Sequence, residues 1–272
     1  MKQWLIFTDL DGSLLDHNSY SHRPADALLK QLNKDHVPVI LSTSKTRAEV
    51  VNLRKELKNH HPFIVENGAA AFIPLGYFPA MPEECTEKDG YWVYEFSKPR
   101  QHWLDLLERS KITFSHHFSH FAAMKERVIA DVTGLTLTKA KLANKREYSE
   151  PIYWLGVDAK KKEFIDYLER QGGNLLQGGR FLHLSGDCNK GKALQWMVRQ
   201  FIHFSIPCDL AILAIGDSGN DVAMLEAADV ALIIKSPAHA SPKLKRTENH
   251  IISDDYGPKG WANGVKKIIY GQ

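Results

Sequence analysis

The sequence predicts an α/β protein with a Rossmann-like parallel sheet as its core and an inserted α/β cap domain. Three observations predict this fold. Short, continuously apolar segments alternate with helical segments over the first 65 residues, and the same alternation returns after about residue 190. Between them lies a stretch in which aromatic-rich strands alternate with helices. Because continuous apolar runs are typical of strands buried on both faces, the two outer parts should share one parallel sheet.

The N-terminal part predicts three strands separated by two helices. The strands are apolar throughout, and Pro24 is placed to open the first helix, since proline suits a first helical turn. In the second helix the apolar side chains Val50, Leu53 and Leu57 share one face. The expected strands are 4–7, 37–42 and 63–65, and the expected helices run from 24 and over 46–59.

The C-terminal part repeats this alternation of strands and helices, so we expect its strands to lie beside the N-terminal ones. Its expected elements are helix 192–204, strand 210–215, a helix after 220 and strand 230–234. The intervening stretch predicts strands 92–96 and 151–156 and helices 101–109, 138–146 and 160–171. We therefore expect residues 1–80 and 186–272 to form the catalytic core and residues 81–185 to form the cap.

Composition narrows the class of protein. The chain has 272 residues, 43% hydrophobic and 25% charged, with a net charge of +3 and basic residues scattered among acidic ones, so nucleic-acid binding is not indicated. Cys85, Cys188 and Cys208 have no CxxC spacing, which argues against a disulfide framework or a zinc site. No apolar run approaches a membrane span or a secretory signal. We expect a cytoplasmic protein without a membrane partner; the oligomeric state is not predicted.

Polar residues follow three of the predicted strands. Asp9 and Asp11 follow the first, residues 42–45 (STSK) follow the second, and residues 216–221 (GDSGND) follow strand 210–215. Ligands of open parallel sheets bind at the carboxyl ends of the strands, so these groups should converge. Carboxylates this close repel strongly unless a cation lies among them. An all-oxygen set suits Mg²⁺, which shares its coordination with phosphate.

Such a site predicts phosphoryl transfer. One carboxylate can attack phosphorus to form an acyl phosphate, and a second, two residues on, can protonate the leaving alcohol and activate water. Either motif alone is also compatible with a simple turn or a helix cap. A calcium-binding loop fits poorly, because Gly12 comes too early and Tyr20 stands where such a loop needs glutamate. The occurrence of both motifs after buried strands favours the catalytic interpretation.

With these residues identified, the chain resembles the haloacid dehalogenase superfamily along nearly its whole length. Residues 9–13 (DLDGS) resemble its first motif, so the resemblance implies Asp9 as nucleophile and Asp11 as acid/base. It further implies that Mg²⁺ is held by the Asp9 side chain, the Asp11 carbonyl and Asp217. The remaining implied roles are phosphate binding by Thr43, the third-motif lysine, Lys190, and support of the metal site by Asn220 and Asp221.

The inserted cap resembles the subclass that acts on sugar phosphates. Residues 42–46 (STSKT), 66–70 (ENGAA) and 177–184 (QGGRFLHL) are similar to the mannosyl-3-phosphoglycerate phosphatases. The resemblance implies hydrolysis of mannosyl-3-phosphoglycerate to mannosylglycerate and phosphate. Another sugar or glycosyl phosphate, including glucosyl-3-phosphoglycerate, a phosphomutase, or a non-catalytic phosphosugar-binding regulator remain alternatives. Expected substrate contacts are Ser44, Lys45, Glu66, Asn67, Gln177, Arg180 and His183, with Arg180 assigned to a carboxylate or a sugar oxygen.

Two further features of the sequence are explained as well by structure as by function. His116, His117 and His120 could bind a transition metal, but no carboxylate or cysteine in the segment completes a ligand set, and an amphipathic cap segment explains the pattern as well. The basic run 139–146 (KAKLANKR) is expected to be a solvated helix face.

Overall fold

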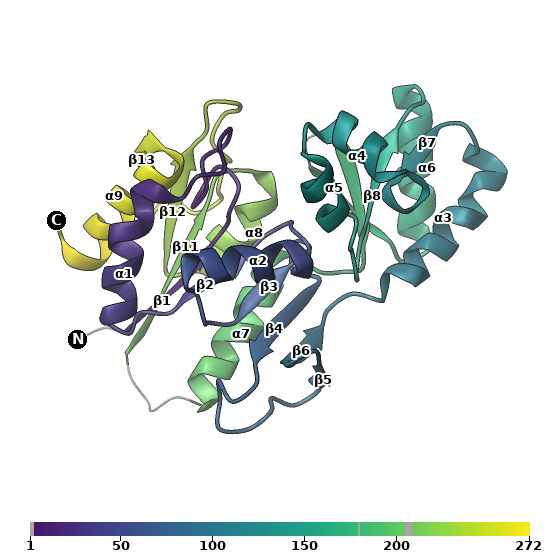
Figure 1. Cartoon of the computed structure of the whole chain (residues 1–272). Helices are drawn as coiled ribbons and strands as arrows, with labels where there is room; N and C mark the ends of the chain where they lie inside the picture. The colour runs from purple at the N-terminus through teal and green to yellow at the C-terminus, as the bar shows by residue number, and fades with distance from the viewer. Residues whose placement is uncertain (1–2, 179, 205–208) are drawn as a thin grey trace.

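Two lobes make up the protein (Figure 1), and the structure, a computed structural model, describes residues 3–178, 180–204 and 209–272. Within these residues the larger lobe holds a nine-stranded sheet. In spatial order its strands are β13 (His250–Tyr256), β12 (Val230–Lys235), β11 (Leu210–Gly216), β1 (Gln3–Thr8), β2 (Val39–Ser42), β3 (Phe63–Val65), β4 (Ala70–Pro74), β6 (Tyr91–Glu95) and β5 (Thr86–Lys88).

The six strands from β13 to β3 are parallel, which confirms the predicted α/β sheet. Helices cover both faces, so every central strand is buried on two sides and can be apolar throughout. One face carries α1 (Asp26–Lys34), α2 (Arg47–Leu57) and α9 (Gly257–Tyr270). The other carries α7 (Lys190–Phe204) and α8 (Val222–Ala227). Short 3₁₀ turns precede α1 and α8: η1 (Arg23–Ala25) and η3 (Gly219–Asp221).

One expected element lies elsewhere than the sequence places it. The sequence assigns residues 92–96 to the cap, but β6 pairs antiparallel with β4 and β5, and so extends the larger sheet. A short strand's own residue pattern does not specify which strand it pairs with, so its lobe could not be predicted. Beyond this correction, the division into 1–80 with 186–272 and 81–185 stays a prediction.

The smaller lobe holds an antiparallel sheet of β7 (Phe118–His120), β8 (Glu150–Trp154), β10 (Phe181–Ser185) and β9 (Asn174–Gly178), in that order. One cluster of apolar side chains joins this sheet to α3 (Arg100–Phe114) and α6 (Asp158–Arg170). A second cluster joins it to η2 (Phe121–Ala123), α4 (Glu126–Thr133) and α5 (Leu137–Ala143). The expected helices 101–109, 138–146 and 160–171 correspond to α3, α5 and α6.

The segment between α5 and β8, residues 144–149, fastens the smaller lobe to the larger one. Tyr148 is 1% exposed, belongs to the apolar core of the larger lobe, and donates its hydroxyl to Glu95 over 2.8 Å. The neighbouring Glu147 pairs with Arg47 at 2.6 Å and with Lys88 at 2.5 Å. The lobes are thus joined by more than the two chain crossings on either side of the cap, which limits how freely they can move.

No helix in the described ranges is both long and apolar enough to cross a membrane. Cys85 and Cys188 are buried free thiols, and Cys208 lies outside the described residues.

Candidate active site

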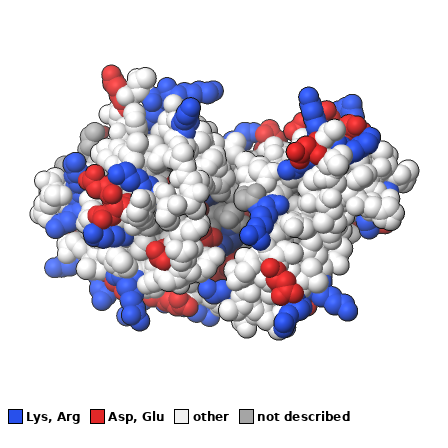
Figure 2. Space-filling view, turned by 90° about the horizontal axis from the view of Figure 1, so that it is seen from above, with Lys and Arg blue, Asp and Glu red and all other residues white. Residues whose placement is uncertain are grey.

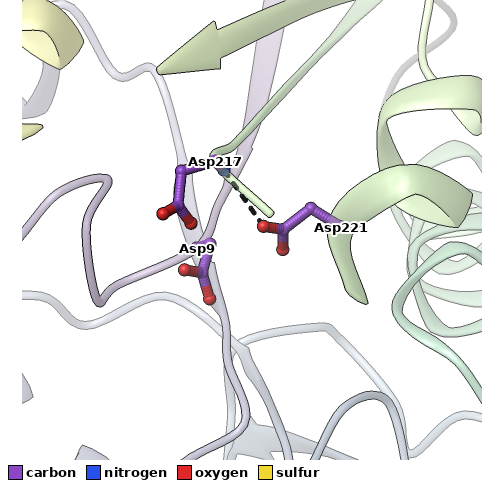
Figure 3. Close-up of side chains that lie close together, drawn as sticks. All are labelled: Asp9, Asp217 and Asp221. Atoms are coloured by element: carbon purple, nitrogen blue, oxygen red, sulfur yellow. Dashed lines mark hydrogen bonds between the residues drawn. The ribbon is translucent and has the colours of Figure 1, made fainter. Parts of the chain in front are cut away.

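The site lies where β1 and β11 end side by side. The two strands pair in parallel up to Thr8 and Ile215, and the Asp9 backbone nitrogen donates to the Ile215 carbonyl over 2.8 Å. Asp9 and Asp217 therefore leave the sheet at the same edge. Figure 3 shows their carboxylates facing a common space with Asp221 beside them, as expected from the position of both motifs after buried strands.

Three buried carboxylates form one cluster. Carboxylate oxygens of Asp9, Asp217 and Asp221 all lie within 4.8 Å of one another. Each of the three residues is at most 5% exposed to solvent. Burial raises the pKa of Asp9 well above its usual value; the Lys190 charge opposes this, and the neighbouring carboxylates add to it. Burial, followed by the Asp221 charge, raises the pKa of Asp217 to about 6. The cluster therefore holds more negative charge than its surroundings compensate.

Lys190 supplies the positive charge that the protein itself contributes. It stands at the first position of α7 with its residue fully buried, and its Nζ lies 2.5 Å from Asp9 Oδ1 and 2.6 Å from Asp221 Oδ1. Burial alone would lower its pKa, but the attraction of Asp221 and Asp9 outweighs burial and raises it. The ammonium group is therefore charged and held between the two carboxylates.

Asp221 is committed to the protein. Its second oxygen, Oδ2, accepts hydrogen bonds from the backbone nitrogens of Asp217 and Ser218, both over 3.1 Å. Gly216 leaves room for this arrangement, since a Cβ there would lie 2.4 Å from the Asp221 Cβ. Asp221 thus orients the loop that carries Asp217, and its support of a metal site stays a prediction.

The donor set fits a hard divalent cation. Asp9 and Asp217 offer carboxylate oxygens in a buried cluster with surplus negative charge, and Mg²⁺ prefers oxygen ligands of this kind. Because Asp221 is occupied by protein donors, Asp9 and Asp217 are the carboxylates available to an ion. The predicted contribution of the Asp11 carbonyl stays a prediction.

Asp11 lies at the rim of the cluster, turned toward the second strand's loop. Its Oδ2 accepts from Lys45 Nζ over 2.7 Å, while its buried Oδ1 has no hydrogen-bond partner among the described residues. Burial would lower the pKa of Lys45, but Asp11 and then Glu49 outweigh it and raise that pKa. An unpaired buried carboxylate oxygen close to Asp9 is suited to proton transfer with a substrate.

The loop after β2 brings Thr43 to the same edge. Thr43 is 1% exposed, and its Oγ1 accepts from the Lys45 backbone nitrogen over 3.2 Å, which leaves its hydroxyl proton for another acceptor. Ser44 presents its carbonyl to Arg146 of the smaller lobe. The loop is rigid because Thr46 begins α2 with a reciprocal capping box to Glu49.

The loop after β3 packs against the segments that carry Thr43, Lys190 and Asn220. Three successive residues, Glu66, Asn67 and Gly68, have φ of 50°, 60° and 92°, a left-handed run that only a well-packed surrounding maintains. The Asn67 Oδ1 accepts from Asn220 Nδ2 over 3.0 Å. A Cβ on Gly68 would lie 2.3 Å from the Asn189 backbone, so the glycine lets this loop pack directly beside Lys190.

Glu66 faces the lobe connection. It is 1% exposed; its Oε1 accepts from the Glu147 backbone nitrogen over 2.8 Å, and its Oε2 accepts from Tyr148 nitrogen over 3.3 Å and Ser149 Oγ over 2.5 Å. Both oxygens are therefore occupied by protein donors. The predicted contact of Glu66 with substrate stays a prediction that this geometry does not favour.

The predicted cap residues are dispersed. His183, on β10, lines a cavity of about 100 Å³ between the lobes together with Asn67 and Asn220, and its buried Nδ1 has no partner among the described residues. Arg180 is exposed and donates to the Val132 carbonyl over 3.2 Å. Gln177 is exposed and accepts from Lys161 on α6 over 3.0 Å. Of these three residues, the structure brings His183 to the junction with the core.

The histidine segment is structural in this arrangement. His120 Nδ1 lies 2.9 Å from the fully buried Glu150, which also accepts from Arg100, and His117 stacks on Trp154. Among the described residues, the carboxylate cluster is the one group of potential metal ligands found, so the amphipathic interpretation of this segment is favoured.

Sequence reasoning missed two residues at the site. His239, in the loop after β12, places Nε2 3.3 Å from Asp217 Oδ2. Arg146 reaches from the smaller lobe to the Ser44 carbonyl over 3.2 Å. Neither had a signal of its own: His239 stands in a segment without periodicity, and Arg146 ends a basic run that is typical of a solvated helix.

The chain is similar in sequence to a known family of hydrolases and to named phosphatases. Residues 6–260 match the family described as haloacid dehalogenase-like hydrolase. A glucosyl-3-phosphoglycerate/mannosyl-3-phosphoglycerate phosphatase from Methanococcoides burtonii is 35% identical over 267 residues, covering 97% of each chain. A protein of the same name from Persephonella marina is 34% identical over 268 residues, again covering 97% of each chain.

Solved structures share the fold. A phosphatase of the haloalkanoate enzyme superfamily from Bacteroides thetaiotaomicron superposes with a TM-score of 0.68 at 15% identity, over 97% of this chain and 94% of that one. The sucrose-phosphatase from Synechocystis, solved with sucrose and phosphate, superposes with a TM-score of 0.59 at 16% identity, over 97% of each chain. At sequence identities this low, the superpositions show a shared fold and carry no information about function.

Proposed function

The chain belongs to the haloacid dehalogenase-like hydrolases and is a phosphatase. We propose that it hydrolyses mannosyl-3-phosphoglycerate to mannosylglycerate and phosphate. The observation that carries the proposal is the similarity over 97% of both chains to phosphatases named for the glucosyl and mannosyl compounds. The glucosyl compound is the alternative substrate, since both sugars appear in those names.

Asp9 is the proposed nucleophile. One of its oxygens attacks the substrate phosphorus, the ester oxygen leaves, and an aspartyl-phosphate remains on Asp9. The contact between Asp9 Oδ1 and Lys190 supports this assignment, because the ammonium favours the ionised carboxylate and so opposes the burial that raises its pKa. The phosphate in transit would be bound by the Thr43 hydroxyl and the Lys190 ammonium.

Asp11 is the proposed acid and base. It gives a proton to the departing alcohol oxygen of mannosylglycerate, then removes a proton from the water that attacks the aspartyl-phosphate. Its partnerless Oδ1 supports this role, and the ion pair with Lys45 holds the side chain in position. Hydrolysis of the acyl phosphate returns free Asp9 and inorganic phosphate.

Mg²⁺ is the proposed cofactor, held by Asp9 and Asp217 with the Asp11 carbonyl. When bound, it would offset the charge of the carboxylates and of the transferring phosphoryl group. Buried free thiols at Cys85 and Cys188 suit a reducing compartment, so the cytoplasm is the proposed location.

A substrate panel tests the proposal. Phosphate release is measured from mannosyl-, glucosyl- and unglycosylated 3-phosphoglycerate and from hexose phosphates, with Mg²⁺ and with a chelator. We expect Mg²⁺-dependent release, fastest from the mannosyl compound. A hexose phosphate hydrolysed better than every phosphoglycerate would refute the proposed substrate, and isotope-labelled phosphate retained on a sugar product would indicate a mutase.

A further inference from the structure

Arg146 is a buried cation that the proposed chemistry leaves unused. It lies in the segment that fastens the two lobes together, and its side chain is 6% exposed. Its Nη1 donates to the Ser44 carbonyl over 3.2 Å and to Ser149 Oγ over 3.1 Å. The guanidinium therefore stands directly beside the loop that carries Thr43, at the junction of the lobes.

Its charge is poorly compensated compared with the other cations near the site. Lys190 has carboxylate oxygens at 2.5 and 2.6 Å, and Lys45 has one at 2.7 Å. Arg47, which reaches the same lobe connection, has carboxylate oxygens at 2.6 and 2.9 Å. In the part of the chain that the structure describes, the ion-pair partner of Arg146 is Glu66, and their closest atoms are 3.7 Å apart.

Glu66 attracts Arg146 across 3.7 Å but makes no hydrogen bond to it, so none of the guanidinium's donors is used by this carboxylate. Its two oxygens already accept from three donors of the lobe connection, the Glu147 and Tyr148 nitrogens and the Ser149 hydroxyl. Moreover, the Arg146 Nε is buried and has no hydrogen-bond partner among the described residues. A buried guanidinium with an unused donor is costly to the folded state unless another anion completes its surroundings.

The charge of Arg146 acts on a residue that lines the cavity between the lobes, and Ser149, which accepts from its Nη1, lines that cavity too. Burial, and after it the Arg146 charge, lowers the pKa of His183 to about 3, and His183 lines that cavity. Figure 2 shows Lys and Arg side chains entering the hollow between the lobes. The amide and hydroxyl groups of the cavity suit neutral sugar hydroxyls, whereas Arg146 requires an anion.

We infer that Arg146 binds the carboxylate of the substrate and thereby selects phosphorylated acids over phosphorylated alcohols. This rests on the proposed function, because a phosphoglycerate carries its carboxylate only a few bonds from the phosphoester. A guanidinium can hold a carboxylate through two parallel hydrogen bonds, which the free Nε allows. Arg180, exposed and bonded within the smaller lobe, is left to contact a sugar oxygen.

The test compares two substrates that differ only in this group: mannosyl-3-phosphoglycerate and the analogue in which an alcohol replaces the carboxylate. For Arg146→Gln we expect kcat/KM to fall about 10- to 100-fold on the acid and less than about threefold on the alcohol. Arg146→Lys keeps the charge but loses the paired geometry, so it should lose part of this selectivity while folding normally. Lys145→Gln, an exposed neighbour, removes the same charge and should change neither value.

Equal losses on both substrates, in Arg146→Gln or in Arg146→Lys, would mean a structural role and would overturn the inference. A carboxylate-selective loss in Arg180→Gln instead would also overturn it. If the wild type hydrolysed neither glycosylated compound, the proposed substrate would be wrong, and 3-phosphoglycerate and glycerol 3-phosphate would replace them. No preference of the wild type for the acid in either pair would overturn the inference as well.

Discussion

Replacing Lys190 by methionine tests whether its ammonium holds the carboxylate cluster together. The side chain is fully buried, with Nζ 2.5 Å from Asp9 and 2.6 Å from Asp221. Methionine fills a similar volume without charge, so Asp9, Asp217 and Asp221 would remain buried without their cation. Removing one partner of a buried ion pair typically costs about 3–5 kcal/mol. That is a large share of the roughly 5–15 kcal/mol by which domains are stable.

The assay is urea unfolding in a chelator and again in Mg²⁺, together with phosphate release. Because a divalent cation can replace part of the lost charge, we expect the destabilisation of Lys190→Met to be larger in the chelator than in Mg²⁺. Activity should fall by about 10²- to 10³-fold in either case, since the proposed mechanism also uses Lys190 to stabilise the charge of the transferring phosphoryl group.

Lys192→Met is the matched control. Lys192 lies on the same helix and pairs with Asp187 at 2.5 Å, but this pair is exposed to solvent, and such pairs contribute at most about 1 kcal/mol. If Lys190→Met were as stable as Lys192→Met in the chelator, the ammonium would not be compensating the cluster. Unchanged turnover in Lys190→Met would contradict its proposed role in binding the phosphoryl group.

Two other predictions use the same structure. Gly12 has φ of 79°, and a Cβ there would lie 2.5 Å from Asp217 Oδ2, so Gly12→Ala should raise the Mg²⁺ concentration needed for half-maximal phosphate release by about tenfold or more. Gly90→Ala, with φ of 82° but open space, controls for backbone strain alone, and equal effects would exclude displacement of Asp217. Burial, aided by Arg54, lowers the pKa of His61 to about 4, below its unfolded value of 6.5, so the unfolded chain binds the proton first and stability falls as pH drops from about 6.5 to 4. In urea unfolding, His61→Gln should reduce this slope by up to about 1 kcal/mol per pH unit, and an unchanged slope would show that other groups cause it.

The central part of the site was predictable because it depends on local sequence. A buried strand that ends in Asp9 and another that ends before Asp217 place both carboxylates at one sheet edge, whichever helices surround them. Parallel pairing then follows from the helices that separate the strands. Lys190 was expected as the third-motif lysine from the family resemblance, and its contact with Asp9 over 2.5 Å comes from the structure.

The residues around the cap were harder to predict because their positions depend on contacts between distant segments. Glu66 stands beside Asn67 in the sequence, yet it bonds to the lobe connection while Asn67 bonds to Asn220. Arg146 belongs to a basic run that is typical of a solvated helix, but it lies beyond the end of α5, where the chain is buried between the two lobes. Pairings of this kind depend on how the lobes dock, and residue periodicity carries no information about docking.

The geometry of Asp11 is a further case. The sequence assigns it to proton transfer and Lys45 to substrate, without any sign that the two side chains meet. The structure joins them at 2.7 Å. Asp11 and Lys45 are far apart in the sequence, but β1 and β2 are neighbours in the sheet and bring the two loops that follow them together.

The central claim is that Asp9 carries the phosphoryl group, and phosphate release by Asp9→Asn tests it most directly. Asparagine keeps the shape and the burial of the side chain but is not a carboxylate nucleophile, so the account predicts a folded protein with no detectable release from mannosyl-3-phosphoglycerate in Mg²⁺. Turnover by folded Asp9→Asn at a rate near that of the wild type would contradict the aspartyl-phosphate mechanism.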